Sequence, residues 1–184
     1  MRNIWVISDT HFGDEKFYTY KLDDGTPARY FKNYIDADIY MVDKWNSVVK
    51  PEDKVYMLGD LGKKRVLKYI LPSLNGTKVL IKGNHDRDKI SFYKEYFKDI
   101  RAYHHIDNIL MAHIPVHPNC KGKFKIQVHG HTHAFCVKDN FYYNVCVEKH
   151  DYTPVHFDII KEYAEKYKQN IEENNNIWDW CYKE

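Results

Sequence analysis

The sequence predicts an α/β protein in which two β-sheets pack face to face and helices lie outside them. Two observations carry this prediction. In residues 1–97, short apolar strand patterns alternate with helical patterns, as in a largely parallel sheet flanked by helices. In residues 100–157, short strand patterns follow one another with turns between them. The 184 residues contain no linker-like segment, so we expect a single domain over residues 1–184.

The spacing of apolar residues defines the elements of the first half. Residues 3–8 are apolar, β-branched and aromatic, which is typical of a buried strand. Apolar residues recur at helical spacing from Ile35 to Val49, and Pro51 closes that helix. The same criteria predict, in order, a strand at 54–58, a helix at 66–71 stopped by Pro72, a strand at 77–82 and a helix at 89–97.

A polar, tyrosine-rich segment at residues 13–33 separates the first strand from the first helix. Within it, Asp23-Asp24-Gly25 is a turn signal. A loop of this length is uncommon in a compact domain and often carries function. Two interpretations stay open: a lid over a binding site, and an extension at the edge of the fold.

The second half reads as a run of strands followed by one helix. The hydrophobic pattern predicts strands at 100–106, 108–112, 124–129, 134–138, 141–147 and 153–157. Lys138-Asp139-Asn140 indicates a hairpin turn between two of them. A helix at 158–169 then precedes a polar tail.

Composition narrows the class of protein. The formal net charge of +2 does not indicate the strongly basic face of a bulk nucleic-acid binder, although a local basic patch remains compatible with it. No run of about 20 apolar residues predicts a membrane span, and the N-terminal residues lack the apolar region of a signal peptide. The four cysteines are scattered, which indicates reduced thiols. We therefore expect a cytoplasmic protein with no obligate protein partner.

Polar residues that can bind metal ions or take part in catalysis follow the ends of the expected strands. Because the carboxyl ends of strands in an open α/β sheet converge on one crevice, we expect these side chains to meet there. They are Asp9 and His11 after the first strand, Asp60 after the second, Asn84, His85 and Asp86 after the third, and His113, His131 and His133 after later strands.

The residue types at these strand ends suit metal ions. Carboxylate, amide oxygen and imidazole together favour Mn, Fe, Zn and related divalent cations. The absence of cysteine from the set argues against a structural zinc site. Asp60 lies midway in the order and can bridge two ions through its two oxygens. His117 competes with His113 as a ligand, but His113 directly follows an apolar strand. For His117, a place in the substrate pocket and a purely structural position both stay open.

Taken together and in order, five sequence blocks resemble those of the calcineurin-like metallophosphoesterases. One block alone would be weak evidence, because GD pairs and isolated DxH triplets are common. The blocks are Asp9-Thr10-His11, Gly59-Asp60, Gly83-Asn84-His85-Asp86, His113 and Gly130-His131-Thr132-His133.

The resemblance implies a fold, a metal centre and a reaction. The implied fold is a four-layer α-β-β-α sandwich, and the implied reaction is attack on a phosphate ester by water activated between two cations. We expect two divalent ions, Mn²⁺ foremost, with Fe, Zn, Ni and Mg as alternatives. We also expect His85 to contact the phosphate and protonate the leaving oxygen. The implied ligands are Asp9, His11, Asp60 and His133 for one metal and Asp60, Asn84, His113 and His131 for the second.

Departures from the family's protein phosphatases narrow the expected substrate. Those enzymes typically carry GDxxxRG and GNHE, whereas this chain has Gly59-Asp60-Leu61-Gly62-Lys63-Lys64-Arg65 and ends its third block in Asp86. We therefore favour a phosphodiesterase acting on a small nucleotide-like diester. A phosphomonoesterase, a nuclease and a non-catalytic scaffold on the same fold are the alternatives. Arg87, Lys63 and Lys64 follow metal-binding turns and could meet a phosphate, although a solvated surface explains them equally well.

Overall fold

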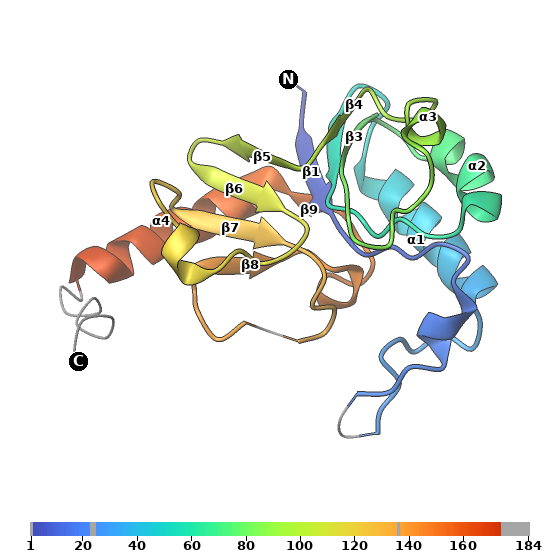
Figure 1. Ribbon diagram of the computed structural model, residues 1–184, viewed down its shortest axis with the longest axis horizontal. Helices are drawn as coiled ribbons and strands as arrows, with labels where there is room; N and C mark the ends of the chain where they lie inside the picture. Colours follow the sequence, from blue (N-terminus) through green and yellow to red (C-terminus); the bar gives the residue numbers. More distant parts are fainter. Residues whose placement is uncertain (1, 23–24, 136, 174–184) are drawn as a thin grey trace.

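Two mixed β-sheets form the centre of the protein, and helices pack around them (Figure 1). The computed structural model describes residues 2–22, 25–135 and 137–173. The fold class expected from the sequence, an α/β arrangement of two mixed sheets with flanking helices, is confirmed. Among the described residues, no helix is both long enough and apolar enough to cross a membrane.

The first sheet contains the strands of the alternating first half. Its order is β4-β3-β2-β1-β9. Strands β1 to β4 are parallel to their neighbours, and β9 runs antiparallel to β1. The strands are β1 (Ile4–Ile7), β2 (Lys54–Met57), β3 (Thr77–Ile81), β4 (Asp99–Arg101) and β9 (Val155–His156).

The second sheet is built from the later strands in the order β5-β6-β7-β8. Only β5 and β6 are antiparallel; β6, β7 and β8 run parallel to one another. Its strands are β5 (Tyr103–Ile106), β6 (Ile109–Ala112), β7 (Ile126–His129) and β8 (Tyr142–Asn144).

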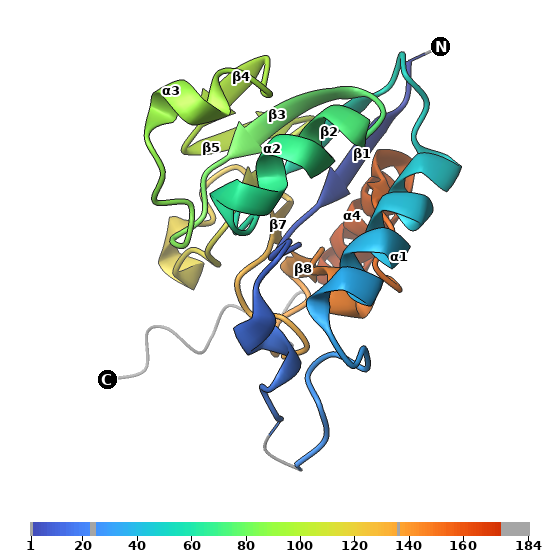
Figure 2. The same cartoon turned by 90° about the vertical axis from the view of Figure 1, so that its right-hand side faces the viewer.

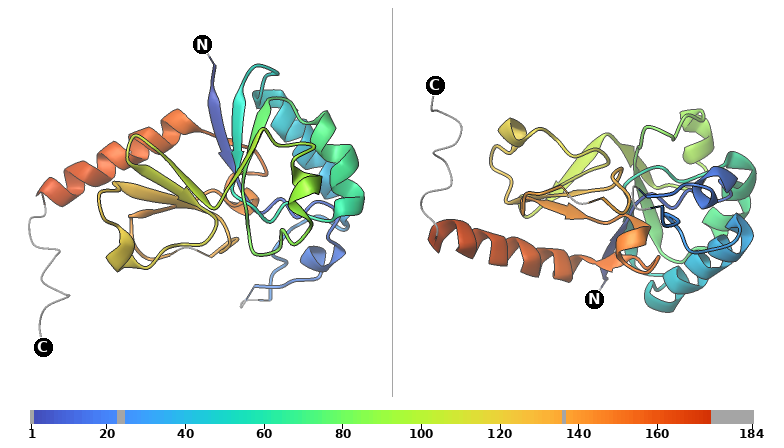
Figure 3. Two further views of the ribbon diagram at one scale, coloured as in Figure 1. Left: turned by 45° about the horizontal axis from the view of Figure 1, so that its top comes forward. Right: turned by 90° about the horizontal axis from the view of Figure 1, so that it is seen from below.

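Three helices pack against the first sheet, on the side away from the second (Figure 2). They are α1 (Tyr34–Val48), α2 (Lys64–Ser73) and α3 (Ile90–Tyr93). The long helix α4 (Phe157–Glu173) runs alongside the second sheet (Figure 3). Short 3₁₀ helices occur at η1 (Glu15–Tyr18), η2 (Pro118–Cys120) and η3 (Val147–Lys149).

Two apolar clusters hold these layers together. The outer cluster packs Trp45 of α1 and Leu67 of α2 against Met57 of the first sheet. The inner cluster lies between the sheets, where Leu58 meets Val128 and α4 contributes further side chains. Burying each large apolar side chain stabilises the fold by roughly 1.5–3 kcal/mol, so the facing apolar surfaces fix the sheets, and therefore the strand ends, relative to each other.

The strand expected at residues 100–106 is two strands in different sheets. Strand β4 pairs with β3 in the first sheet, whereas β5 pairs with β6 in the second. The chain therefore crosses between the layers near Ala102. A continuous strand-like sequence cannot report this crossing, because hydrophobic alternation does not specify which neighbour a strand will pair with.

The strand expected at 134–138 and its hairpin turn are wrong for the described residues of that range. The backbone of this segment is bound by a side chain and not by a neighbouring strand. Asn144 Nδ2 donates to the carbonyls of His133 (2.9 Å) and Phe135 (3.1 Å). Because the described residues of 134–138 form no strand, the turn at Lys138-Asp139-Asn140 joins no hairpin. Strand β8 pairs instead with β7, and this pair is parallel, which requires a crossover connection.

Two predicted helix limits also differ from the structure. Helix α2 continues past Pro72 to Ser73, so the proline lies in its last turn instead of stopping it. Helix α3 covers only Ile90–Tyr93, a shorter span than the predicted 89–97.

Candidate metal site

The strand ends bring the candidate metal ligands together at one edge of the two sheets. They come from the connections that follow strands β1, β2, β3, β6 and β7. Two groups of ligand atoms form there, each with its atoms within 4.8 Å of one another. The first group is Asp9, His11 and His133, and the second is Asp60, His113 and His131.

The first group is centred on one oxygen of Asp9. His11 Nε2 lies 3.8 Å from Asp9 Oδ1, and His133 Nε2 lies 3.6 Å from the same atom. Asp9 and His11 are buried, so this group is shielded from solvent on two sides. The other Asp9 oxygen accepts hydrogen bonds from Ser8 Oγ (2.6 Å) and His131 N–H (2.8 Å), which leaves Oδ1 to face the imidazoles.

The second group gathers around Asn84, as expected from the third sequence block. Asn84 Oδ1 lies 2.8 Å from His113 Nε2 and 3.0 Å from His131 Nδ1. The other ring nitrogen of His113 is 2.6 Å from the Leu58 carbonyl, to which it donates, and this contact turns Nε2 toward the site. Because Asn84 and His131 are exposed, this group opens to solvent.

Asp60 joins the two groups. Its Oδ2 lies 3.7 Å from His11 Nε2 in the first group and 3.3 Å from His113 Nε2 in the second. Its Oδ1 accepts the backbone N–H of His85 at 2.8 Å. One carboxylate oxygen is therefore anchored, and a single oxygen, instead of the two expected from the sequence, faces the imidazoles of both groups.

Two buried atoms in the first group have no hydrogen-bond partner among the described residues, Asp9 Oδ1 and His11 Nε2. Leaving a buried polar atom unpaired costs about 1–3 kcal/mol. A divalent cation between these two atoms would satisfy both, and nitrogen and oxygen donors suit Mn, Fe, Zn and Ni. The side chains present therefore fit a metal centre.

Five of the candidate ligands have left-handed backbone conformations. For residues other than glycine this region is disfavoured, and such strain of order 1–3 kcal/mol concentrates at functional sites. Tertiary hydrogen bonds hold the turns, since Asp9 N–H donates to Gly59 O and His11 N–H donates to Asp60 O. The φ angles are 60° at Asp9, 47° at His11, 54° at Asp60, 68° at His131 and 50° at His133.

Two motif glycines are required by close approach to these carboxylates. A Cβ at Gly83 would lie 2.2 Å from Asp60 Oδ1, and one at Gly130 would lie 2.2 Å from Asp9 Oδ2. Neither position has room for a larger residue unless a candidate ligand moves. Gly83 of the third block thus lets its turn approach the Asp60 carboxylate, and Gly130 of the fifth block lets its turn approach the Asp9 carboxylate.

The charges in the site perturb its titration. Burial alone would raise the pKa of Asp9, but the neighbouring His11 imidazole and the charges of His133 and His113 outweigh it and hold the pKa below its ordinary value. Burial lowers the pKa of His11. His113 has a raised pKa, because its contacts with Asp60 and the charge of Asp9 outweigh burial. Paired carboxylates and imidazoles of this kind are frequent at functional sites.

Glu148 supports the first group, and sequence reasoning did not identify it. Glu148 Oε1 lies 3.1 Å from His133 Nδ1, so a proton on that nitrogen leaves Nε2 directed at Asp9. Arg29 donates to the same oxygen through Nε (2.9 Å), and its Nη2 forms an ion pair with that oxygen at 2.8 Å. A carboxylate that fixes the ring of a ligating histidine typically tunes metal affinity.

Arg29 also holds the turn that carries the first two candidate ligands. Its Nη2 donates to the Asp9 carbonyl (2.6 Å), and its Nη1 donates to the Thr10 carbonyl (3.0 Å). The guanidinium is only 1% exposed. No motif marks this arginine, because it belongs to the polar segment 13–33.

The same segment covers the first group from another side. The Phe17 ring stacks on His11 with a centroid distance of 3.7 Å and lies 4.8 Å from the His133 ring. Residues of the 13–33 segment thus pack directly against the candidate ligands. Whether the segment also moves as a lid stays a prediction.

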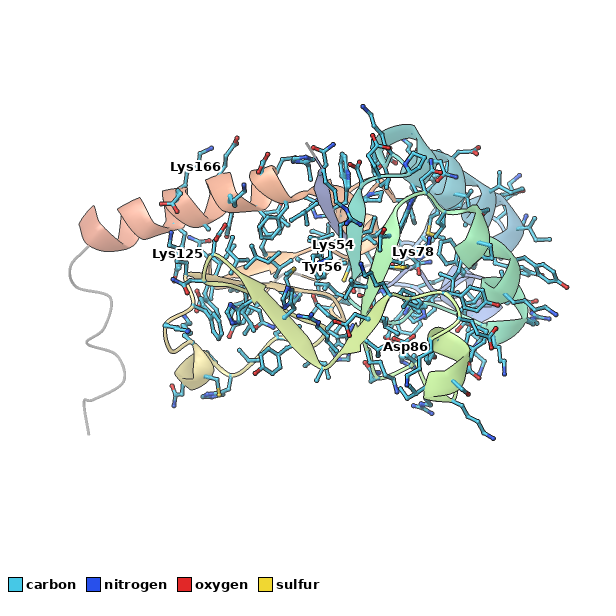
Figure 4. All side chains as sticks on the ribbon, turned by 90° about the horizontal axis from the view of Figure 1, so that it is seen from above. Lys54, Tyr56, Lys78, Asp86, Lys125 and Lys166 are labelled. Atoms are coloured by element: carbon cyan, nitrogen blue, oxygen red, sulfur yellow. The ribbon has the colours of Figure 1, made fainter. Side chains whose placement is uncertain are left out.

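Asp86, in the connection between β3 and α3, ties together two turns that carry candidate metal ligands (Figure 4). Its buried carboxylate accepts three backbone N–H groups, from Gly83 (2.8 Å), Asp60 (2.9 Å) and Leu61 (2.9 Å). The aspartate of the third block therefore has a structural task in this chain, in which it fixes the turn of Asp60 against that of Asn84.

The predicted substrate contacts fall in different places. His85 and Arg87 line a cavity of about 390 Å³ that reaches His11 at the metal site. His117 is exposed on the connection between β6 and β7, where its Nδ1 accepts the Asn119 N–H at 3.2 Å. The pocket role of His117 stays a prediction, and so does the catalytic role of His85.

The chain matches known proteins along most of its length. Residues 1–146 match the family described as the calcineurin-like phosphoesterase superfamily domain. Glu148 lies just beyond the matched range. An uncharacterized protein of Methanocaldococcus jannaschii, MJ1445, is 32% identical over 179 residues, covering 91% of this chain and 94% of that protein. The gene 66 protein of Mycobacterium phage D29 is 27% identical, covering 75% and 82%.

A solved structure also resembles the fold. The crystal structure of a protein of unknown function from Aquifex aeolicus, AQ665, superimposes with a TM-score of 0.68. The two chains are 29% identical, and the match covers 88% of this chain and 99% of the other. The shared architecture therefore extends over nearly the whole of that protein.

Proposed function

The chain belongs to the calcineurin-like phosphoesterase superfamily, and on that premise we propose that it is a phosphodiesterase that hydrolyses a small nucleotide-like diester. The family and the two groups of candidate ligands support a metal-dependent phosphoesterase. The diester substrate, Mn²⁺ as the native metal and a cytoplasmic location belong to the proposal.

The observation that carries the proposal is the position of Asp60 Oδ2. It faces imidazoles of both groups at 3.7 Å and 3.3 Å, while the unpaired Asp9 Oδ1 and His11 Nε2 lie beside it. Seven side chains could then hold two ions that share Asp60. They are the shared Asp60, with Asp9, His11 and His133 on one side and Asn84, His113 and His131 on the other.

The bound ions supply one part of the chemistry: two divalent cations lower the pKa of a water and offset the charge of the phosphate. The chain supplies the rest. Asp60, Asp9 and the histidines would hold the ions. The exposed side chains of Asn84 and His131 leave the second group accessible to a phosphate from solvent.

His85 is the proposed proton donor. Its backbone N–H is fixed on Asp60 Oδ1, so its ring begins one residue from the candidate ligand Asn84. The ring is exposed, lies 5.6 Å from the His11 ring and lines the adjoining cavity. In this position it can protonate the oxygen that leaves phosphorus.

The size of the cavity and the motif sequence favour a small diester. A cavity of about 390 Å³ falls in the range of small-molecule sites. The sequence after Asp60 and the aspartate at position 86 depart from the protein phosphatase motifs. A folded phosphoprotein is therefore a poorer candidate than a small ester.

A comparison of two chromogenic esters tests the proposal. With Mn²⁺ present, we expect faster hydrolysis of bis(p-nitrophenyl) phosphate than of p-nitrophenyl phosphate. A clear preference for the second ester would establish the phosphomonoesterase instead. Digestion of DNA and RNA polymers would identify a nuclease, and a metal-loaded protein inert toward every ester would indicate a scaffold.

A further inference from the structure

The cavity beside the candidate metal site is lined mainly by charged side chains. They are Lys63, Lys64 and Arg87, with Asp14 and Asp88. The imidazoles of His11 and His85 also line it. Among the described residues, no aliphatic side chain and no phenyl, phenol or indole ring lines it. An acyl chain would find no aliphatic partner there.

The charges in this cavity are only partly paired. Lys63 Nζ and Asp14 Oδ2 form an ion pair at 2.8 Å and largely cancel. Lys64 has no carboxylate partner among the described residues, and its Nζ lies 5.0 Å from the centroid of the Phe92 ring. Among the described residues that line the cavity, the three basic side chains outnumber the two acidic ones, Asp14 and Asp88, by one.

Arg87 is held in a geometry suited to an anion. Its Nε donates to the Asn84 carbonyl at 3.3 Å, which ties the guanidinium to the turn that carries a candidate ligand. The described residues offer no hydrogen-bond partner to its two terminal nitrogens. A planar guanidinium of this kind can bind two oxygens of one phosphate at once.

We infer that the substrate carries a second phosphate group, which Lys64 and Arg87 bind in this cavity while the scissile phosphate lies at the metal site. The inference rests on the proposed phosphoester hydrolysis and deepens it by naming the substrate class. It also assigns the cavity to the phosphate end of the substrate.

A matched pair of esters tests this inference: thymidine 5′-(p-nitrophenyl phosphate) with and without a 3′-phosphate. We expect kcat/KM to be about 10-fold higher for the ester with the second phosphate, chiefly through KM. Lys64→Ala and Arg87→Ala should each reduce this ratio, and the double variant should bring it close to one. Lys68→Ala is the control, because Lys68 lies one turn further along α2 and outside the cavity lining.

Binding is measured separately from turnover. Calorimetry on the Mn²⁺-loaded protein compares thymidine 3′,5′-bisphosphate with thymidine 5′-monophosphate, and the bisphosphate should bind about 10-fold more tightly. Tighter binding without hydrolysis of either ester would count against the proposed function and support the second-phosphate site. Hydrolysis of both esters with equal kcat/KM, or a preference that survives in the double variant, would overturn the inference and leave the proposed function standing.

Discussion

Replacing Glu148 with glutamine tests how the protein prepares the first candidate metal group. One oxygen of the carboxylate, Oε1, accepts from His133 Nδ1 at 3.1 Å and from Arg29 Nε at 2.9 Å, and it lies 2.8 Å from Arg29 Nη2. Glutamine keeps the shape of the side chain but removes the negative charge. Because both partners contact the same oxygen, a glutamine carbonyl oxygen can still accept from both, and the substitution tests the charge of Glu148.

Two magnitudes follow from these contacts. Mutation of the partner of a ligating histidine typically weakens metal binding 10- to 100-fold, which corresponds to about 1.4–2.7 kcal/mol. Separately, Arg29 stays buried without its counter-charge, and breaking a buried pair costs about 3–5 kcal/mol. Because Arg29 keeps its bonds to the Asp9 and Thr10 carbonyls, we expect the lower end of that range.

Two assays separate these effects. Calorimetric titration with Mn²⁺ should show that Glu148→Gln weakens one of two binding steps, because Glu148 contacts only His133 among the candidate ligands. Urea denaturation of the metal-free protein should show the loss of stability. The matched control is Glu15→Gln, which removes one partner of the exposed Arg65–Glu15 pair at 3.5 Å, where we expect a change under about 1 kcal/mol. Wild-type Mn²⁺ affinity in Glu148→Gln would refute the argument that the charge of this carboxylate strengthens His133 as a ligand.

Three further predictions concern the bridge, the turn connection and pH. Asp60→Asn should nearly abolish ester hydrolysis and lower the Mn²⁺ stoichiometry from two toward one, because the amide removes the charge shared by both groups. The circular dichroism spectrum should change little, and unchanged activity would refute the ligand assignment. Asp86→Ala should lower the unfolding free energy measured in urea by about 3 kcal/mol or more, since it leaves three backbone N–H groups without their acceptor. A loss below about 1 kcal/mol would show that water accepts from these groups in place of the carboxylate. Burial alone would raise the pKa of Glu148, but Arg29 and His133 hold this pKa below its ordinary value of 4.5. The contribution of Glu148 to the stability of the fold is therefore present above about pH 4.5 and is lost as the pH falls through the folded pKa. The unfolding free energy of the metal-free protein should therefore fall on acidification below about pH 4.5, and a slope in Glu148→Gln equal to that of the wild type would assign the effect to other groups.

The local pattern of the sequence determined the alternating half of the fold and the positions of the candidate ligands. Strands β1, β2 and β3 lie within the predicted ranges, because strand patterning and turn glycines act over a few residues. The polar residues that follow those strands had to meet once the strands became parallel neighbours. The order of the strands along the chain was therefore enough to place Asp9, Asp60 and Asn84 at one site.

Tertiary structure alone decided which sheet each later strand would join and which residues support the ligands. Residues 100–106 divide between two sheets, because pairing partners are chosen by packing and not by the pattern of the strand itself. Glu148 and Arg29 are 119 positions apart, and a buried polar pair leaves no periodic signal in the sequence. Only folding brings Arg29 to the Asp9 carbonyl and Glu148 to the His133 ring, because these contacts join segments that are distant in the sequence.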